Sequence, residues 1–122
     1  NPTGKVFNHD ELEFIADLVK RYDTYAICDE VYEHLIFDDV KHIPLITIAG
    51  MADRTVSISS AGKTFSMTSW KVGYLTAAPK LMSLIAKAHR FLVFTTPSNL
   101  QRAVAYGLNN EEAWYTNLAM EL

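Results

Sequence analysis

The chain lacks the features of several large protein classes. Its 122 residues include one cysteine, Cys28, which excludes an internal disulfide and fits a reducing compartment such as the cytoplasm. No apolar run approaches the ~20 residues of a membrane-spanning helix, and no secretory signal is visible. The 11 basic residues form no stripe and are outnumbered by 14 acidic ones, which gives a net charge of −3. We therefore expect a cytoplasmic protein that binds neither membranes nor nucleic acid.

The histidines do not form a metal-binding pattern either. They are scattered, at His9, His34, His42 and His89, without the spacing of a zinc site. We therefore predict no metal ion, and we interpret His34 and His42 as surface or loop residues. Cys28 lies in an apolar segment and is interpreted as a packing residue.

Composition and periodicity predict one small α/β domain. Hydrophobic residues make up 49% of the chain, which is enough for a core and too much for a disordered protein. β-branched and aromatic residues predict strands over 25–28, 55–59 and 72–78. Residues 60–71 are too short for a helical crossover, so strand 72–78 is expected to run antiparallel to its neighbour. The sheet is otherwise expected to be mostly parallel.

Helix signals are clearest near the start of the chain. Asn8 is a good N-cap and Glu11 stands at the capping-box position, so we predict a helix over 8–22. This helix, the strand after it and a strand presumed to precede residue 1 form a βαβ pattern. Further helices are predicted over 44–50, over 80–93, after a break at 95–98 as far as about Tyr106 with Gly107 as the C′ residue, and after Asn110 as an N-cap, whereas 33–43 is expected to be irregular.

Polar side chains gather where the predicted strands end. Strand 55–59 leads into a run of small residues that ends in Lys63, and strand 25–28 is followed by Asp29 and, three residues later, Tyr32. The chain opens on Asn1-Pro2-Thr3-Gly4. A cofactor with an aldehyde, a basic ring nitrogen and a phenolic oxygen requires such a set of groups. Pyridoxal 5′-phosphate (PLP) is such a cofactor, and a lysine can hold it as a Schiff base.

Each of these residues also has a plainer interpretation. Most lysines are surface charges, Asp29 can cap a helix, Tyr32 can be a half-buried aromatic, and Asn1-Pro2-Thr3-Gly4 can be a turn. Gly62-Lys63-Thr64 after a strand also resembles the end of a nucleotide-binding P-loop, which requires a glycine where this sequence has Ser57 and a helix directly after the lysine. The residues that follow Thr64 are weak helix formers, which disfavours a P-loop.

Four ordered motifs resemble the cofactor motifs of the fold-type I, class I/II aminotransferases. They are Asn1-Pro2-Thr3-Gly4, Asp29-Glu30-Val31-Tyr32, Ser60-Ala61-Gly62-Lys63 and Trp70-Lys71-Val72-Gly73-Tyr74. The resemblance runs along the whole chain. Within that family, the residues around Lys63 and Lys71 look most like the kynurenine, glutamine-phenylpyruvate and methionine aminotransferases.

The resemblance implies a role for each matching residue. Lys63 matches the Schiff-base lysine, which is both a cofactor ligand and the catalytic base. Asp29 matches the partner of the pyridinium nitrogen, and Tyr32 and Asn1 match the groups that bind the phenolic oxygen. Ser60 matches a phosphate ligand. Lys71 stands where most relatives carry a phosphate-binding arginine, and a lysine does not form the bidentate fork of an arginine.

The resemblance also implies what the whole protein is. Residues 1–122 are expected to be part of the large PLP-binding domain, a three-layer α/β/α unit, without its N-terminal part and without the C-terminal small domain. The whole enzyme is expected to be a homodimer that transfers an amino group from an aromatic, kynurenine-like, methionine or glutamine-type amino acid to a 2-oxo acid. A PLP-dependent cysteine-conjugate β-lyase and a catalytically inactive fragment remain the alternatives.

Overall fold

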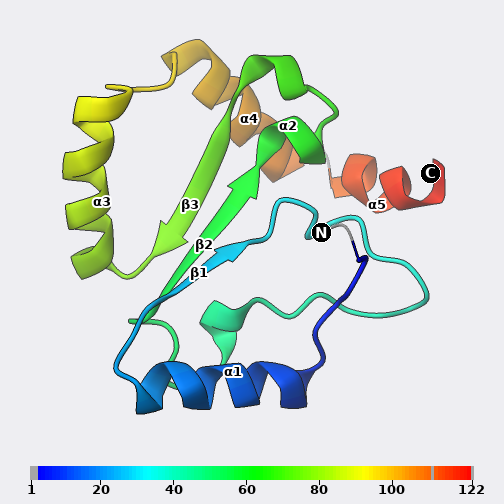
Figure 1. Ribbon diagram of the computed structural model, residues 1–122. Helices are drawn as coiled ribbons and strands as arrows, with labels where there is room; N and C mark the ends of the chain where they lie inside the picture. The colour runs from blue at the N-terminus through cyan, green and yellow to red at the C-terminus, as the bar shows by residue number, and fades with distance from the viewer. Residues whose placement is uncertain (1–2, 111, 122) are drawn as a thin grey trace.

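A computed structural model describes residues 3–110 and 112–121 (Figure 1). Helices and strands alternate along the first part of the chain, and helices alone follow. The elements are α1 (His9–Arg21), β1 (Ala26–Asp29), the 3₁₀ turn η1 (Leu45–Thr47), β2 (Thr55–Ser60), α2 (Ala61–Thr64), the 3₁₀ turn η2 (Thr68–Trp70), β3 (Gly73–Ala77), α3 (Pro79–Leu92), α4 (Ser98–Asn110) and α5 (Glu112–Glu121).

The three strands form one mixed sheet in the order β1-β2-β3. β1 is parallel to β2, and β2 is antiparallel to β3. The α/β class and the antiparallel third strand are therefore confirmed. The short connection between β2 and β3 explains the reversal, since a parallel partner needs a crossover of a dozen or more residues.

The helix α1 begins at the predicted capping box. The Asn8 side chain accepts a hydrogen bond from the Glu11 N–H at 2.9 Å, and the Glu11 carboxylate accepts one from the Asn8 N–H at 2.9 Å. The Lys5 ammonium and the Asn8 N–H lower the pKa of Glu11. The buried face of α1 packs on η1 and on the Ala26 and Cys28 side chains of β1, in a cluster centred on Leu12, Ala16, Val19, Leu45, Ile48 and Met51.

Three details of the helix predictions differ from the structure, and packing explains one of them. The helix predicted over 44–50 is a short 3₁₀ helix, η1, which begins after Pro44 and spans only Leu45–Thr47. α4 continues through Gly107 to Asn110, so Gly107 is not a C′ residue and Asn110 ends a helix rather than capping one. A Cβ atom at position 107 would lie 2.8 Å from Cζ of Phe65, so any larger residue here would require that ring to shift.

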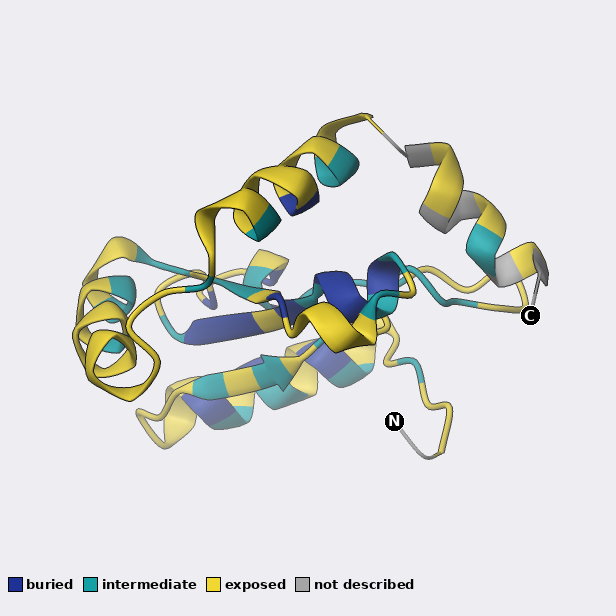
Figure 2. Ribbon diagram, turned by 90° about the horizontal axis from the view of Figure 1, so that it is seen from above, coloured by how far each residue is buried: buried dark blue, intermediate teal, exposed yellow. Residues whose placement is uncertain are grey.

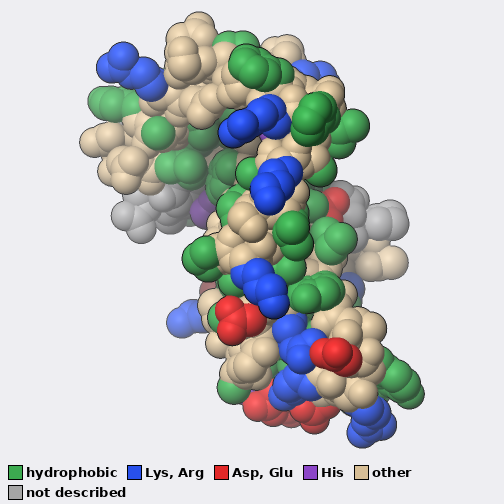
Figure 3. All heavy atoms as spheres, turned by 90° about the vertical axis from the view of Figure 1, so that its left-hand side faces the viewer, with side chains coloured by type: hydrophobic (Ala, Val, Ile, Leu, Met, Phe, Trp, Pro, Cys, Tyr) green, Lys and Arg blue, Asp and Glu red, His purple; other side chains and the backbone are tan. Residues whose placement is uncertain are grey.

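The helices cover the sheet on both sides but incompletely. Figure 2 shows α1 and α4 on opposite sides of the strands. Ile27, in the edge strand β1, remains 73% exposed. α3 has no buried residue, and Figure 3, which looks onto the side that carries α3, shows hydrophobic side chains exposed between Lys and Arg side chains. Among the described residues, no helix is long and apolar enough to span a membrane.

Candidate cofactor site

The carboxyl ends of two parallel strands bring the first candidate residues to one edge of the sheet. Asp29 is the last residue of β1, and Ser60 is the last residue of β2. Asp29 lies opposite Ile58, and Ser60 is two residues further along the same strand. Because side chains alternate along a strand, Asp29, Ile58 and Ser60 are on one face of the sheet.

Lys63 and Tyr32, which are far apart in the sequence, lie in contact. Lys63 is half-buried on the short helix α2, which starts directly after β2. Its Nζ lies 5.5 Å from the centroid of the Tyr32 ring, within the range of a cation–π interaction. Of the six predicted cofactor residues, these two are in direct contact.

A hydrogen-bonded turn after β1 carries Tyr32 to this position. The Glu33 N–H donates to the Glu30 carbonyl at 3.0 Å, which closes a turn with Tyr32 inside it. The Val31 N–H donates to Asp29 Oδ1 at 3.3 Å. The turn therefore fixes Tyr32 while Asp29, which is exposed, keeps most of its acceptor capacity.

The loop that holds Lys63 folds back tightly on itself. The Met67 N–H donates to the Gly62 carbonyl at 3.0 Å, and a Cβ atom at Gly62 would lie 3.1 Å from the backbone Cα of Thr68. Trp114 of α5 donates its indole N–H to the Thr64 carbonyl at 3.1 Å, where α2 ends. A helix that ends one residue after the lysine does not match a P-loop, in which the lysine opens a helix.

Lys71 and Asn1 are the remaining two predicted ligands. Lys71 is exposed after η2, in the left-handed backbone region with φ 55°. Asn1 lies outside the described residues.

A polar cluster that was not predicted from the sequence is centred on Glu30, the residue after Asp29. The side chain of Glu30 is 8% exposed and accepts a hydrogen bond from the hydroxyl of Ser57, on β2. Nε2 of His42 lies 3.6 Å from Glu30 Oε1. The contact with Glu30 raises the pKa of His42, whereas burial acts in the opposite direction. His42 is thus a loop residue as predicted, but it faces a buried carboxylate rather than solvent alone.

The same cluster contains a set of possible metal ligands, although the sequence predicts no metal site. Glu30, Glu33 and His42 each offer a ligand atom, and these atoms lie within 4.8 Å of one another. Strand alternation was the signal that could have revealed the cluster, because it puts Glu30 on the face of the sheet opposite Asp29.

Burial, and then the charge of Glu30, raises the pKa of the Cys28 thiol, which fits a packing role for Cys28.

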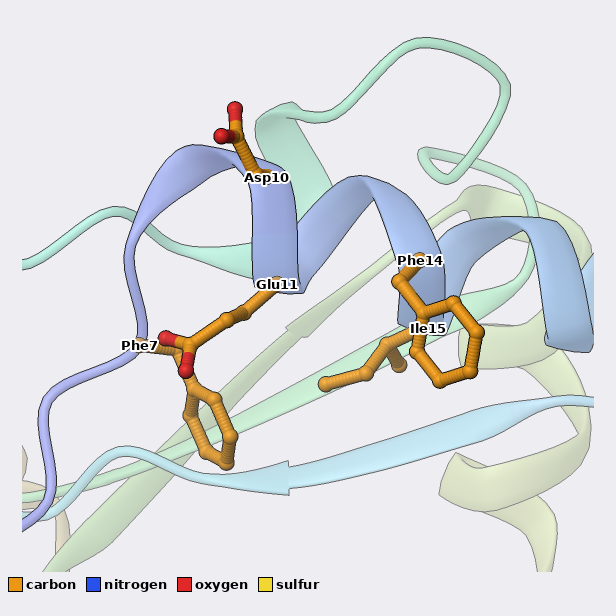
Figure 4. A pocket seen from close by; sticks show the side chains of 5 residues that line it. All are labelled: Phe7, Asp10, Glu11, Phe14 and Ile15. Atoms are coloured by element: carbon orange, nitrogen blue, oxygen red, sulfur yellow. The ribbon is translucent and has the colours of Figure 1, made fainter.

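A shallow hollow on α1 is separate from these residues. Phe7, Asp10, Glu11, Phe14 and Ile15 line it. Figure 4 shows Phe7, Glu11 and Ile15 on the side of the helix that is drawn toward β1, with Asp10 pointing away. None of the predicted cofactor residues borders the hollow, so we assign no role in the chemistry to it.

Comparison with known proteins decides the family. The model of the family "Aminotransferase class I and II" matches residues 1–121. The chain belongs to this family. Human kynurenine–oxoglutarate transaminase 3 is 40% identical over 129 residues, which cover 100% of this chain and 28% of the human protein. The predicted resemblance is therefore confirmed.

Solved structures of aminotransferases have the same fold. The N-succinyldiaminopimelate aminotransferase from Mycobacterium tuberculosis superimposes with a TM-score of 0.95 at 40% identity, over 99% of this chain and 32% of that one. Escherichia coli YbdL, described with a methionine aminotransferase function, superimposes with a TM-score of 0.90 at 33% identity, over 97% of this chain and 31% of that one. The chain thus spans about a third of the relatives that it matches.

Members of the class I and II aminotransferases bind PLP, and the donors at this edge of the sheet fit that cofactor. Lys63 offers an amine for the aldehyde, and the phenol of Tyr32 lies beside it. The only hydrogen bond that Asp29 accepts within the described chain comes from Val31, so its carboxylate is available for a ring nitrogen. Ser60 offers a hydroxyl that is only half-buried.

Proposed function

We propose that this chain is the central part of a PLP-dependent enzyme that transfers an amino group from an amino acid to a 2-oxo acid. The observation that carries the proposal is the contact between Lys63 and Tyr32 at the carboxyl ends of β1 and β2. In a member of this aminotransferase family, a half-buried lysine beside a phenol and near a strand-end carboxylate has the chemistry that the cofactor needs.

Lys63 is the proposed catalytic residue. Its Nζ would hold PLP covalently, as the sequence predicts, and the freed amine would remove the proton from the substrate Cα and deliver it to C4′ of the cofactor. Bound PLP supplies an electron sink for the charge that is left on that carbon. The tight loop of Gly62, Met67 and Thr68 holds α2 in place, which limits the positions that Nζ reaches.

Asp29 and Tyr32 have supporting roles in this proposal. The Asp29 carboxylate favours a protonated ring nitrogen, because an opposite charge within a few ångströms stabilises the charged form of its partner. The Tyr32 hydroxyl donates to the phenolic oxygen of the cofactor, and the family resemblance implies the same role for Asn1. Ser60 binds the phosphate together with Lys71, whose long flexible side chain allows it to reach the phosphate from its exposed position.

The organisation of the whole protein is also a proposal. We propose that residues 1–122 belong to the large PLP-binding domain, and that an N-terminal part and a C-terminal small domain complete the enzyme. The relatives' extra length supports this. The exposed apolar residues of α3 support a homodimer. The single cysteine supports a cytoplasmic location.

The amino donor is proposed only as a class. The three relatives reported above act, by their names and descriptions, on kynurenine, N-succinyldiaminopimelate and methionine. We propose an aromatic, kynurenine-like, methionine or glutamine-type donor, as the sequence motifs indicate.

A paired assay on the intact protein tests the proposed reaction. Purified protein with PLP is given each amino donor with and without a 2-oxo acid, and the new amino acid and keto acid are measured. Conversion that depends on the 2-oxo acid supports the proposal. Release of pyruvate and ammonia from a cysteine conjugate without any 2-oxo acid would instead indicate a β-lyase. The isolated 122-residue chain is expected to be inactive in both assays, and turnover by it would exclude the inactive-fragment alternative.

A further inference from the structure

The polar cluster of Glu30, Ser57 and His42 lies next to Asp29, one of the predicted cofactor residues. We infer that Glu30 is a positioning residue: its buried side chain fixes the end of β1 to β2, so that Asp29 and Tyr32 face Lys63. The inference rests on the proposed function for the roles of Asp29, Tyr32 and Lys63. Its structural part, the fixing of the turn by Glu30, does not depend on a cofactor.

Glu30 is joined to β2 twice. Its backbone N–H donates to the Ile58 carbonyl at 2.8 Å, which extends the parallel pairing one residue beyond β1. Its carboxylate accepts a hydrogen bond from the Ser57 hydroxyl, and the Ser57 side chain is itself buried. A buried carboxylate is stable only when its oxygens have partners, so this contact strongly favours one register at the end of β1.

That register determines where Asp29 and Tyr32 point. Glu30 and Asp29 are neighbours in a strand-like segment, so their side chains lie on opposite faces of the sheet. A slip of one residue would move Asp29 to the face that packs on α1. The Glu30 carbonyl also accepts from the Glu33 N–H at 3.0 Å, so the turn that holds Tyr32 starts from the same anchored residue.

His42, in the segment between β1 and η1, adds a titratable contact to Glu30. His42 faces Glu30 at 3.6 Å, and Glu33 is the second carboxylate near its ring. Glu33 itself accepts a hydrogen bond from the Tyr74 hydroxyl at 3.5 Å and lies 3.9 Å from Nε2 of His34. A protonated His42 would therefore hold Glu30 more firmly than a neutral one.

Amide hydrogen exchange on the intact protein without cofactor tests the anchor. The variants are Glu30→Ala, Glu30→Gln and Ser57→Ala, and Glu13→Ala on the exposed part of α1 is the matched control. We expect exchange in residues 29–35 to rise about tenfold in Glu30→Ala, the size expected when a buried hydrogen-bond partner is lost. Glu30→Gln and Ser57→Ala should show the same local rise to a smaller extent, and Glu13→Ala none.

Two further readouts separate positioning from a general structural role. The dissociation constant for PLP should rise about tenfold in Glu30→Ala, in parallel with the exchange in residues 29–35. In the wild type, the amide exchange of residues 29–35 should also depend on pH. After correction for the intrinsic exchange rate at each pH, it should rise between about pH 6 and 8, where histidine titrates. This pH effect should be absent in His42→Asn and in Glu30→Gln, and present in His9→Asn.

Clear results would overturn the inference. Unchanged exchange in residues 29–35 for Glu30→Gln and Ser57→Ala, or a rise spread evenly over the whole protein, contradicts an anchoring role. If Glu30→Ala does not fold, these two variants decide the question alone. Local loosening without any change in PLP affinity removes the link to the cofactor site. A wild type that binds no PLP refutes the proposed function, whereas the exchange experiment still reports on the anchor.

Discussion

The amine of Lys63 lies 5.5 Å from the centre of the Tyr32 ring, although the two residues come from different strand ends. The parallel pairing of β1 with β2 produces this contact, because it brings the turn after β1 and the helix α2 to one edge of the sheet. The ring of Tyr32 therefore limits the positions of the lysine amine before any cofactor is present. Predictions about both residues follow from that arrangement.

Replacing Tyr32 by phenylalanine should keep the ring contact and remove only the hydroxyl. We expect PLP to remain bound and kcat/KM to fall about tenfold, since one hydrogen bond to a charged oxygen is lost. The control is Tyr25→Phe, because Tyr25 is also exposed and lies before β1, away from the strand end. Steady-state kinetics of the intact enzyme measure the effect. Equal kcat/KM values for Tyr32→Phe and wild type would contradict the proposed role.

Replacing Asp29 by alanine should separate binding from chemistry. The other ligands keep PLP bound, but kcat should fall by about 10³-fold, because the ring nitrogen loses the carboxylate that favours its protonated form. Titration with PLP and single-turnover kinetics measure the two effects. Asp53→Ala, at an exposed turn position, is the matched control. Near-normal turnover in Asp29→Ala would show that Asp29 has another role.

Replacing Gly107 by alanine should destabilise the protein, although alanine is the better helix former. The new Cβ would lie 2.8 Å from Cζ of Phe65, so the ring must shift against its neighbours Val104 and Ala61. We expect a net loss of about 1 kcal/mol, because overpacking outweighs the gain in helix propensity. Urea unfolding of the intact protein measures it, and the Phe65→Leu background should relieve it. A stabilised Gly107→Ala variant would mean that Phe65 does not confine this position.

The contact between His42 and Glu30 should make stability depend on pH. The contact raises the folded-state pKa of His42 above its ordinary value of 6.5. The stabilisation is therefore complete below that ordinary value and is lost as the pH rises through the folded-state value. NMR titration of the His42 ring should show the raised pKa in the wild type and a lower one in Glu30→Gln. A His42 pKa that is unaffected by Glu30→Gln would rule out the contact.

Local signals in the sequence account for much of the fold. The capping box of Asn8 and Glu11 fixes the start of α1 through contacts only three residues apart, so its pattern is visible in the sequence. The reversal at β3 follows from the length of the connection after β2. The strands predicted over 25–28 and 55–59 each stop one residue before β1 and β2 do, at Asp29 and Ser60, because the apolar runs in the sequence mark each strand closely.

Contacts between distant segments account for what the sequence did not reveal. Gly107 looks like a helix terminator until Phe65, from another loop, is seen against it. His42 looks like a surface histidine because its partner Glu30 lies on the preceding strand end and Ser57 on the next strand. Such pairs depend on how the elements pack, and neither residue type nor local spacing records that packing.

The central claim is that Lys63 carries PLP, and one measurement tests it most directly. The intact protein is incubated with PLP, reduced with borohydride, digested and analysed by mass spectrometry, with Lys63→Ala and Lys71→Ala treated in parallel. We predict a stable pyridoxyl phosphate adduct on Lys63 in the wild type and in Lys71→Ala, and no adduct at position 63 in Lys63→Ala. An unmodified Lys63 in the wild type, or an adduct at another lysine in its place, would contradict the account.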